Sequence, residues 1–311
     1  MSFVSPAALE LANQRRAITL MMVGLALLLC LDASGKYLGA HGVPVGASTW
    51  SRYFGHFLFV LIVFLPRDGV SMFRPRRPWV QWVRGVMMVG VTLFYFAALG
   101  HVPLADATAI FFLTPILTTV WSAWLLGERP GRWTLLATIV GFAGVLVVAR
   151  PGSQVPLVGV LLVLGAALCN SAYQTLTRAA TARAGANQGA EIASTQLLWS
   201  GLVGAVLMTI AIPWWWRDGW YLGQSATTWT VFAATGILGA LGHWLLIRAY
   251  QLASATAIAP WMYMQLLVSV ALGWFIFGAV PDGVTLVGMV VIGLAPQLTR
   301  LSGRRTRLRP T

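Results

Sequence analysis

Four ionisable residues fall inside the first two long apolar segments of this 311-residue chain. Asp32 and Lys36 are four residues apart, as are Arg52 and His56, so each pair would share one face of a helix. Ionisable groups in apolar segments are costly and commonly mark a solute path. The two cations could attract a carboxylate, whereas Asp32 could attract an amine or accept a proton. The alternatives are an ion-pair network that joins the two helices, or a lysine that reaches the membrane surface.

A polar stripe interrupts the apolar segment around residue 170. Its members recur at the helical period and are Asn170, Tyr173, Gln174 and Thr177. Polar side chains in a membrane helix must face a cavity or a neighbouring helix. The length of the stripe and its tyrosine favour a cavity wall, and hydrogen bonding between helices is the alternative.

His243 follows three glycines spaced by three residues, Gly236, Gly239 and Gly242. Close helix packing explains the glycines. The imidazole titrates near neutrality, which makes His243 a candidate for proton coupling. We therefore group Asp32, Lys36, Arg52, His56 and His243 as candidates for charge or proton coupling.

Two prolines, Pro115 and Pro260, lie inside apolar segments and predict hinges, because proline frees a carbonyl one turn earlier. Aromatic residues flank both prolines. Aromatic and methionine side chains around a bend suit a flat or variably shaped ligand, and ordinary packing or lipid contact is the alternative. The predicted substrate site contains Tyr95, Phe111, Phe112, Asn170, Tyr173, Gln174, Trp261 and Tyr263.

The composition excludes a soluble protein, because the chain is 58% hydrophobic and only 9% charged. The net charge of +13 would suggest nucleic-acid binding in a soluble chain, but here the arginines lie between apolar runs and indicate topology instead. Two cysteines and four scattered histidines match no metal-site spacing. Enzyme signatures are absent, so we predict no catalytic activity, no cofactor and no metal.

Ten apolar segments are long enough to cross a bilayer. They fall near residues 18–38, 45–65, 79–100, 103–126, 132–150, 156–178, 190–213, 227–250, 254–279 and 282–300. Most arginines lie on alternate connections, and only Arg150 and Arg217 fall on the other side. The rule that cytoplasmic loops are positive then predicts that both termini are cytoplasmic.

Repeated phrases divide the chain at about residue 153. Ala107–Ile110 recurs as Ala255–Ile258, and Leu29–Ala33 has a fainter echo in Leu168–Ala172. Five helices per half is an odd number, so the second half must enter the membrane in the opposite direction. We predict an all-α integral membrane protein with two inverted five-helix repeats, 1–153 and 154–311. The cytoplasmic tail Arg300–Arg309 should contact anionic lipids.

The chain resembles the ten-helix, EamA-type members of the drug/metabolite transporter superfamily. The likeness rests on the run at 105–115, the Leu-Leu-Gly-Glu-Arg turn at 125–129 and the glycine-rich phrase at 141–145. It covers both halves, although Ala279 replaces the acidic residue that the family often carries after the glycine. The resemblance implies export of amino acids or other small metabolites, while some members carry S-adenosylmethionine.

These observations predict a secondary transporter in the bacterial inner membrane that exports small metabolites by alternating access. Amino acids, aromatic or other neutral ones, are the favoured substrates. The central cavity should lie between the halves, among the first, third, fourth, sixth, eighth and ninth helices. The alternatives are uptake or exchange of a nucleotide-like metabolite such as S-adenosylmethionine, an integral-membrane enzyme, and a non-transporting scaffold. The sequence makes no prediction of oligomeric state.

Overall fold

The computed structural model describes the backbone of residues 6–98, 100–101, 107, 110–128, 130–149, 156–181, 192–216, 219–268 and 282–306. All regular structure in these residues is helical. The helices before residue 153 are α1 (Pro6–Ala40), α2 (Val45–Asp68), the 3₁₀ helix η1 (Gly69–Phe73), α3 (Pro78–Ala98), α5 (Thr114–Leu126) and α6 (Arg132–Ala149). Those after it are α7 (Leu157–Thr181), α8 (Ala193–Ile210), α9 (Ile212–Trp215), α10 (Ala226–Leu252), α11 (Ala255–Ile258), the 3₁₀ helix η2 (Ala259–Tyr263) and α13 (Gly283–Thr306).

Six helices in the described residues are long and apolar enough to cross a membrane. These candidate spans coincide with α1, α2, α3, α7, α8 and α10, and the span at α2 also includes η1. Three shorter apolar helices, Thr114–Leu126, Arg132–Val147 and Leu286–Ala295, fall in other predicted segments. The predicted segment 254–279 lies partly outside the described residues. The helical, membrane-spanning fold is confirmed, whereas the count of ten spans stays a prediction.

The long helices pack in antiparallel pairs that join the two halves. Gly24 of α1 faces Gly242 of α10, while Leu31, further along α1, approaches Gly239, which precedes Gly242. The helices α3 and α7 also run in opposite directions. Their marker contacts are Arg84 with Thr177 and Gly90 with Cys169.

The helix α2 lies between α8 and α10. It is antiparallel to α8, through Trp50 with Thr209 and His56 with Leu197, and parallel to α10, through Ser51 with Phe232 and Gly55 with Gly236. The helix α3 is parallel to α8, through Trp82 with Trp199 and Gly85 with Val203. These directions together mean that α1, α2 and α3 run opposite to α7, α8 and α10, respectively.

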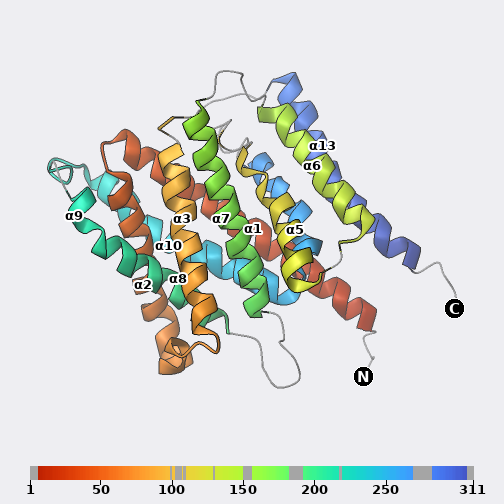
Figure 1. Cartoon of the computed structure of the whole chain (residues 1–311), viewed down its shortest axis with the longest axis horizontal. Coiled ribbons are helices and arrows are strands. Elements are labelled where there is room, and N and C mark those ends of the chain that lie inside the picture. The colour runs from red at the N-terminus through yellow and green to blue at the C-terminus, as the bar shows by residue number, and fades with distance from the viewer. Residues whose placement is uncertain are drawn as a thin grey trace.

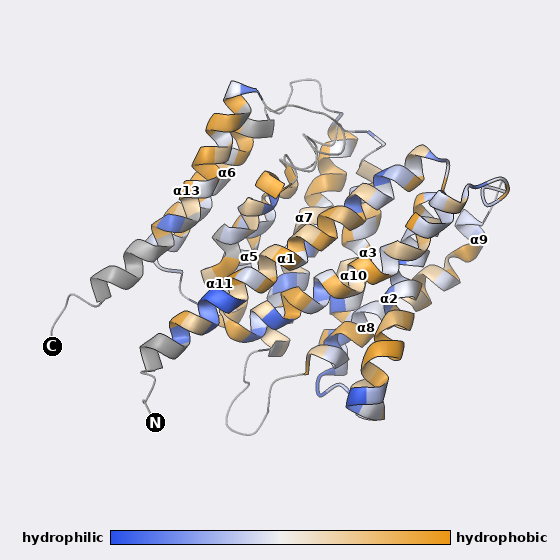
Figure 2. Ribbon diagram, turned by 180° about the vertical axis from the view of Figure 1, so that it is seen from behind, coloured by the Kyte–Doolittle hydropathy of each residue, from blue (hydrophilic) through white to orange (hydrophobic). Residues whose placement is uncertain are grey.

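The helices α6 and α13 lie side by side along one edge of the bundle (Figure 1). A Cβ at Gly144 of α6 would lie 2.8 Å from the Ile292 side chain of α13, so glycine permits this close approach. Hydrophobic colour dominates the helices of the bundle in Figure 2, and hydrophilic segments lie at helix ends and inside the bundle. This distribution fits a bundle whose outer faces meet lipid.

The two segments that follow the Ala-Thr-Ala-Ile phrases are broken helices. Pro115 predicts a bend inside one span, but the structure places a turn at Phe112 and Leu113, and α5 begins at Thr114. Pro115 therefore lies in the first turn of α5, where proline costs no helical hydrogen bond. In the second half α11 gives way directly to η2, which carries a proline near its start. The breaks follow the repeated phrase at similar distances in both halves.

Candidate functional site

A cavity of about 760 Å³, counted with its opening, lies between the two halves. Predicted residues with polar side chains line it, namely Asp32, Arg52, Asn170, Tyr173, Gln174 and His243. Four more predicted residues also line the cavity, namely Tyr95, Phe111, Phe112 and Pro115. All six helical segments that were expected to form the cavity contribute to it, and α2 adds Arg52. A role for these residues in substrate binding stays a prediction.

Arg52 is the central charge of the cavity. It is only 6% exposed and donates from Nη1 to the Thr92 hydroxyl at 2.9 Å. Its Nη2 lies 3.2 Å from Nε2 of His243. Among the described residues, no carboxylate lies within 4 Å of the guanidinium, and Nε has no hydrogen-bond partner. The hydrogen-bond partners of the Arg52 guanidinium among the described residues are therefore a hydroxyl and an imidazole, and neither is an anion.

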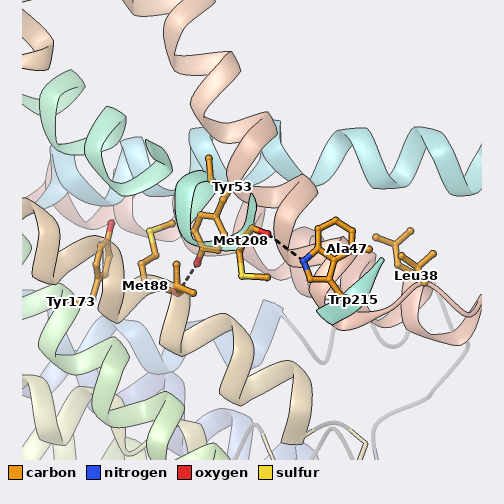
Figure 3. Close-up of a cluster of buried hydrophobic side chains, with 10 residues drawn as sticks. Leu38, Ala47, Tyr53, Met88, Tyr173, Met208 and Trp215 are labelled. Carbon is orange, nitrogen blue, oxygen red and sulfur yellow. Dashed lines mark hydrogen bonds between the residues drawn. The ribbon is translucent and has the colours of Figure 1, made fainter. Parts of the chain in front are cut away.

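The partners of Arg52 are themselves fixed by α2 and α3. The Tyr53 hydroxyl donates to the Met88 carbonyl at 2.6 Å and lies 2.8 Å from the Thr92 hydroxyl. Figure 3 shows the bond from Tyr53 to Met88, with Tyr173 in the same cluster. A Cβ at Gly204 of α8 would overlap the Tyr53 ring, so glycine there lets the ring pack against α8. This packing holds Thr92 where Arg52 can reach it.

Tyr173 connects the cavity to a second buried arginine. Arg84, which is fully buried, donates from Nη2 to the Tyr173 hydroxyl at 3.4 Å, and its guanidinium carbon lies 5.1 Å from the centre of that ring. It also bonds Gln81 and the Thr177 hydroxyl. On its other side the Tyr173 hydroxyl lies 3.4 Å from Nδ1 of His243. Arg84, Tyr173, His243 and Arg52 thus form one continuous chain of contacts.

A second chain leads from the cavity to an ion pair between the halves. The Tyr250 hydroxyl donates to Oε1 of Gln174, and the Tyr250 carbonyl accepts a bond from Nη1 of Arg178 at 2.9 Å. Nε of Arg178 pairs with Glu128 at 2.9 Å. Glu128 belongs to the Leu-Leu-Gly-Glu-Arg turn at the end of α5, so this pair ties the first half to α7 and α10.

Aromatic rings line another part of the cavity. The rings of Tyr95 and Phe111 are 5.0 Å apart. Phe96, which also lines the cavity, packs so closely on Gly35 of α1 that a Cβ there would lie 2.5 Å from the ring. The cavity therefore combines charges of both signs with an aromatic surface.

Five predicted residues do not appear among the side chains that line the cavity. Lys36 is exposed on α1, and His56 is buried between α2 and α8, with Nε2 3.1 Å from the Leu197 carbonyl. Trp261 packs with α1 and α10. Tyr263 packs with Phe112 and the pair α6 and α13. Pro260 is placed only as part of the η2 backbone. Their roles, and the hinge role of both prolines, stay predictions.

Sequence reasoning missed several cavity residues, including Thr92, Phe96, Thr114, Met262 and Gln265. Thr92 lies one helical turn before the predicted Tyr95, a periodic signal that the sequence reasoning did not use. A weaker signal was present, since Gln265 lies one helical turn from the predicted Trp261. Within the described residues no group of three or more His, Cys, Asp or Glu side chains could hold a metal ion.

The model of the EamA-like transporter family matches residues 16–150 and 157–299. The pseudopaline exporter of Pseudomonas aeruginosa is 31% identical over 245 residues, which are 76% of this chain and 80% of that protein. An S-adenosylmethionine uptake transporter of Rickettsia conorii is 28% identical over 270 residues, 84% of each chain. A riboflavin transporter of Vibrio cholerae is 25% identical over 209 residues, 67% of this chain and 66% of that protein.

A solved crystal structure shares the fold, with a TM-score of 0.76 at 21% identity. The match covers 93% of this chain and 98% of the other. The membrane-spanning helices and the bacterial relatives together indicate a bacterial inner membrane. Both halves of the chain match one family model, and the curated relatives are named transporters. The chain belongs to the EamA-like transporter family.

Proposed function

We propose that this protein is a secondary transporter that exports small metabolites, and amino acids above all, across the inner membrane. Two inverted five-helix halves would move around the central cavity in alternating access. The opposite directions of α1, α2 and α3 relative to α7, α8 and α10 support this arrangement. The arginine distribution supports cytoplasmic termini.

The observation that carries the proposal is the lining of the cavity. Asp32 and Arg52 supply opposite charges, while the aromatic rings of the lining supply an apolar surface. An amino acid with an aromatic or other neutral side chain offers both charges and an apolar group. The pseudopaline exporter supports the direction of export.

A second candidate is uptake or exchange of S-adenosylmethionine. It is favoured by the Rickettsia transporter, which matches 84% of this chain. The two candidates differ in the solute, so one flux experiment that compares solutes separates them.

The test is counterflow in proteoliposomes that contain the purified chain. Radiolabelled phenylalanine, leucine and S-adenosylmethionine would each be offered to vesicles loaded with the same unlabelled solute. We expect uptake of an amino acid and little uptake of S-adenosylmethionine. Asn170→Ala should lower the flux, whereas Leu168→Ala, on the exposed face of the same helix, should not. Flux of S-adenosylmethionine alone would replace the first proposal by the second.

A further inference from the structure

The Tyr173 hydroxyl lies between two nitrogen atoms at one end of the cavity. Nη2 of Arg84 and Nδ1 of His243 are each 3.4 Å from it. An arginine guanidinium carries only hydrogen-bond donors, so Arg84 must donate and the hydroxyl oxygen must accept. The direction of the second contact depends on which nitrogen of His243 carries the proton.

Arg52 decides the tautomer of His243. Its Nη2 lies 3.2 Å from Nε2 of His243 and can only donate, so Nε2 must accept. A neutral imidazole with an accepting Nε2 carries its proton on Nδ1. An imidazolium would place a donor against a donor and a second positive charge beside Arg52. His243 is therefore neutral in this arrangement, and Nδ1 donates to Tyr173.

Both contacts use Tyr173 as an acceptor, which leaves its own proton to be donated elsewhere. A phenolic hydroxyl has one proton, and no described residue accepts it. Tyr173 is almost fully buried but lines the cavity. A buried donor without an acceptor is costly, so a ligand atom that accepts this proton would be favoured.

Two buried arginines adjoin this end of the cavity, since Arg52 contacts His243 and Arg84 contacts Tyr173. Arg52 has no carboxylate within 4 Å among the described residues, and two of its three nitrogens bond neutral groups. Asp32 lines the cavity but lies beyond ion-pair distance. A buried cation without a counterion favours an anionic ligand.

We infer that this end of the cavity binds the carboxylate of the transported solute. Tyr173 donates its hydroxyl proton to one carboxylate oxygen, Arg52 supplies the counter-charge, and His243 is a positioning residue that directs the Tyr173 proton. The inference rests on the proposed function, since it gives the polarity with which an amino acid would lie in the cavity. Its amino group would then point towards Asp32 and its side chain towards the aromatic rings.

The test measures binding to the purified full chain by isothermal titration calorimetry with two matched probe pairs. Each pair holds one carboxylate and its carboxamide: phenylalanine with phenylalaninamide, and phenylacetate with phenylacetamide. The wild type should bind the carboxylate of a pair about tenfold or more tightly, because a hydrogen bond to a charged group is stronger than one to a neutral group. Tyr173→Phe should lower this preference, while the charge of Arg52 keeps part of it. Tyr221→Phe, which removes a hydroxyl from an exposed tyrosine that is not among the residues lining the cavity, should keep it.

The positioning role of His243 is tested by three substitutions. His243→Ala removes the donor to Tyr173 and the acceptor for Arg52, and should lower the carboxylate preference. His243→Gln can again accept from Arg52 and should restore part of it, whereas His243→Leu, which fills the space without a hydrogen-bonding group, should not. Thermal unfolding of each variant shows that it is folded.

Equal binding of acid and amide in both probe pairs by the wild type would overturn the inference, as would a full preference in folded Tyr173→Phe. Failure of the proposed function looks different. Carboxylate preference that depends on Tyr173, together with an absence of amino-acid counterflow, would keep the anion site and reject amino acids as the transported solute.

Discussion

The two halves of the protein share a frame but carry different chemistry at matching positions. Ala47–Thr49 and Gly55 of α2 recur as Ala193–Thr195 and Gly201 of α8, and these helices pack antiparallel. In this register Leu198 takes the place of Arg52. The phrase Leu29–Ala33 of α1 aligns with Leu168–Ala172 of α7, so Ser171 holds the position in the second half that corresponds to Asp32. Both charges of the cavity therefore belong to the first half.

The second half supplies neutral hydrogen-bonding groups instead. Asn170, Tyr173, Gln174 and His243 all line the cavity, and His243 bonds Arg52 across the interface between the halves. A symmetric frame can move in two equivalent ways, but an asymmetric lining binds a solute in one orientation only. The comparison therefore separates residues that support movement from residues that select the solute.

Arg52→Leu, which installs the residue of the second half, should have the largest effect. We expect transport to fall by more than about 100-fold, because the cavity loses its only cation among the described residues that line it. Thermal stability should be unchanged or higher, since replacing a buried charge by an apolar residue is often stabilising. Counterflow and thermal unfolding measure the two effects.

The matched control for that substitution is Leu198→Met in α8, which should keep both flux and stability. Normal transport by Arg52→Leu would show that the charge serves the packing of the frame and not the solute.

Asp32→Ser, which again copies the second half, should lower amino-acid transport about tenfold, because a charge-assisted hydrogen bond to the amine is lost. The effect should be confined to solutes that carry an amine, so phenylacetate binding should stay within about twofold. Ser171→Ala on α7 is the matched control and should behave as wild type. A loss that is equal for solutes with and without an amine would contradict this role.

Glu128→Ala gives the turn after α5 the residue that the second half carries at the corresponding position, Ala279. The pair of Glu128 with Arg178 is partly exposed, so its loss should cost no more than about 1 kcal/mol, or about fivefold in the balance between conformations. Flux should change by up to that factor, with unchanged selectivity among solutes. Glu10→Ala near the exposed start of α1 is the control. A change in selectivity would place this pair in the solute site.

Much of the fold and part of the cavity could be predicted because both depend on local patterns. Hydrophobic length gave the segments, and the period of the stripe placed Asn170, Tyr173 and Gln174 on one face. Ionisable residues in apolar segments pointed to Asp32, Arg52 and His243 in the same way. All six line the cavity.

The remaining positions depend on tertiary packing, which the sequence pattern does not encode. His56 has the same spacing from Arg52 as Lys36 has from Asp32, yet α8 covers it. Tyr263 resembles a cavity aromatic in sequence, but it packs against Gly141, where a Cβ would overlap its ring. Thr92 lies one turn before Tyr95, and it bonds Arg52 because that face of α3 is turned towards α2.

Substitution of the prolines in the two broken segments should have the smallest effects. These substitutions test whether each break in the helix is caused by the proline or by tertiary packing. Pro115 lies in the first turn of α5, after the turn at Phe112 and Leu113 has already ended the preceding helix. Pro115→Ala should therefore change flux by less than about twofold and leave thermal stability within about 1 kcal/mol. Pro260→Ala in η2 should behave in the same way.

If instead one substitution lowers flux strongly while the other does not, the proline in that half is a hinge and the halves move by different means. Similar small effects would mean that the break after each Ala-Thr-Ala-Ile phrase is held by tertiary packing. In that case the movement is symmetric, and the asymmetry of this transporter is confined to the side chains that meet the solute.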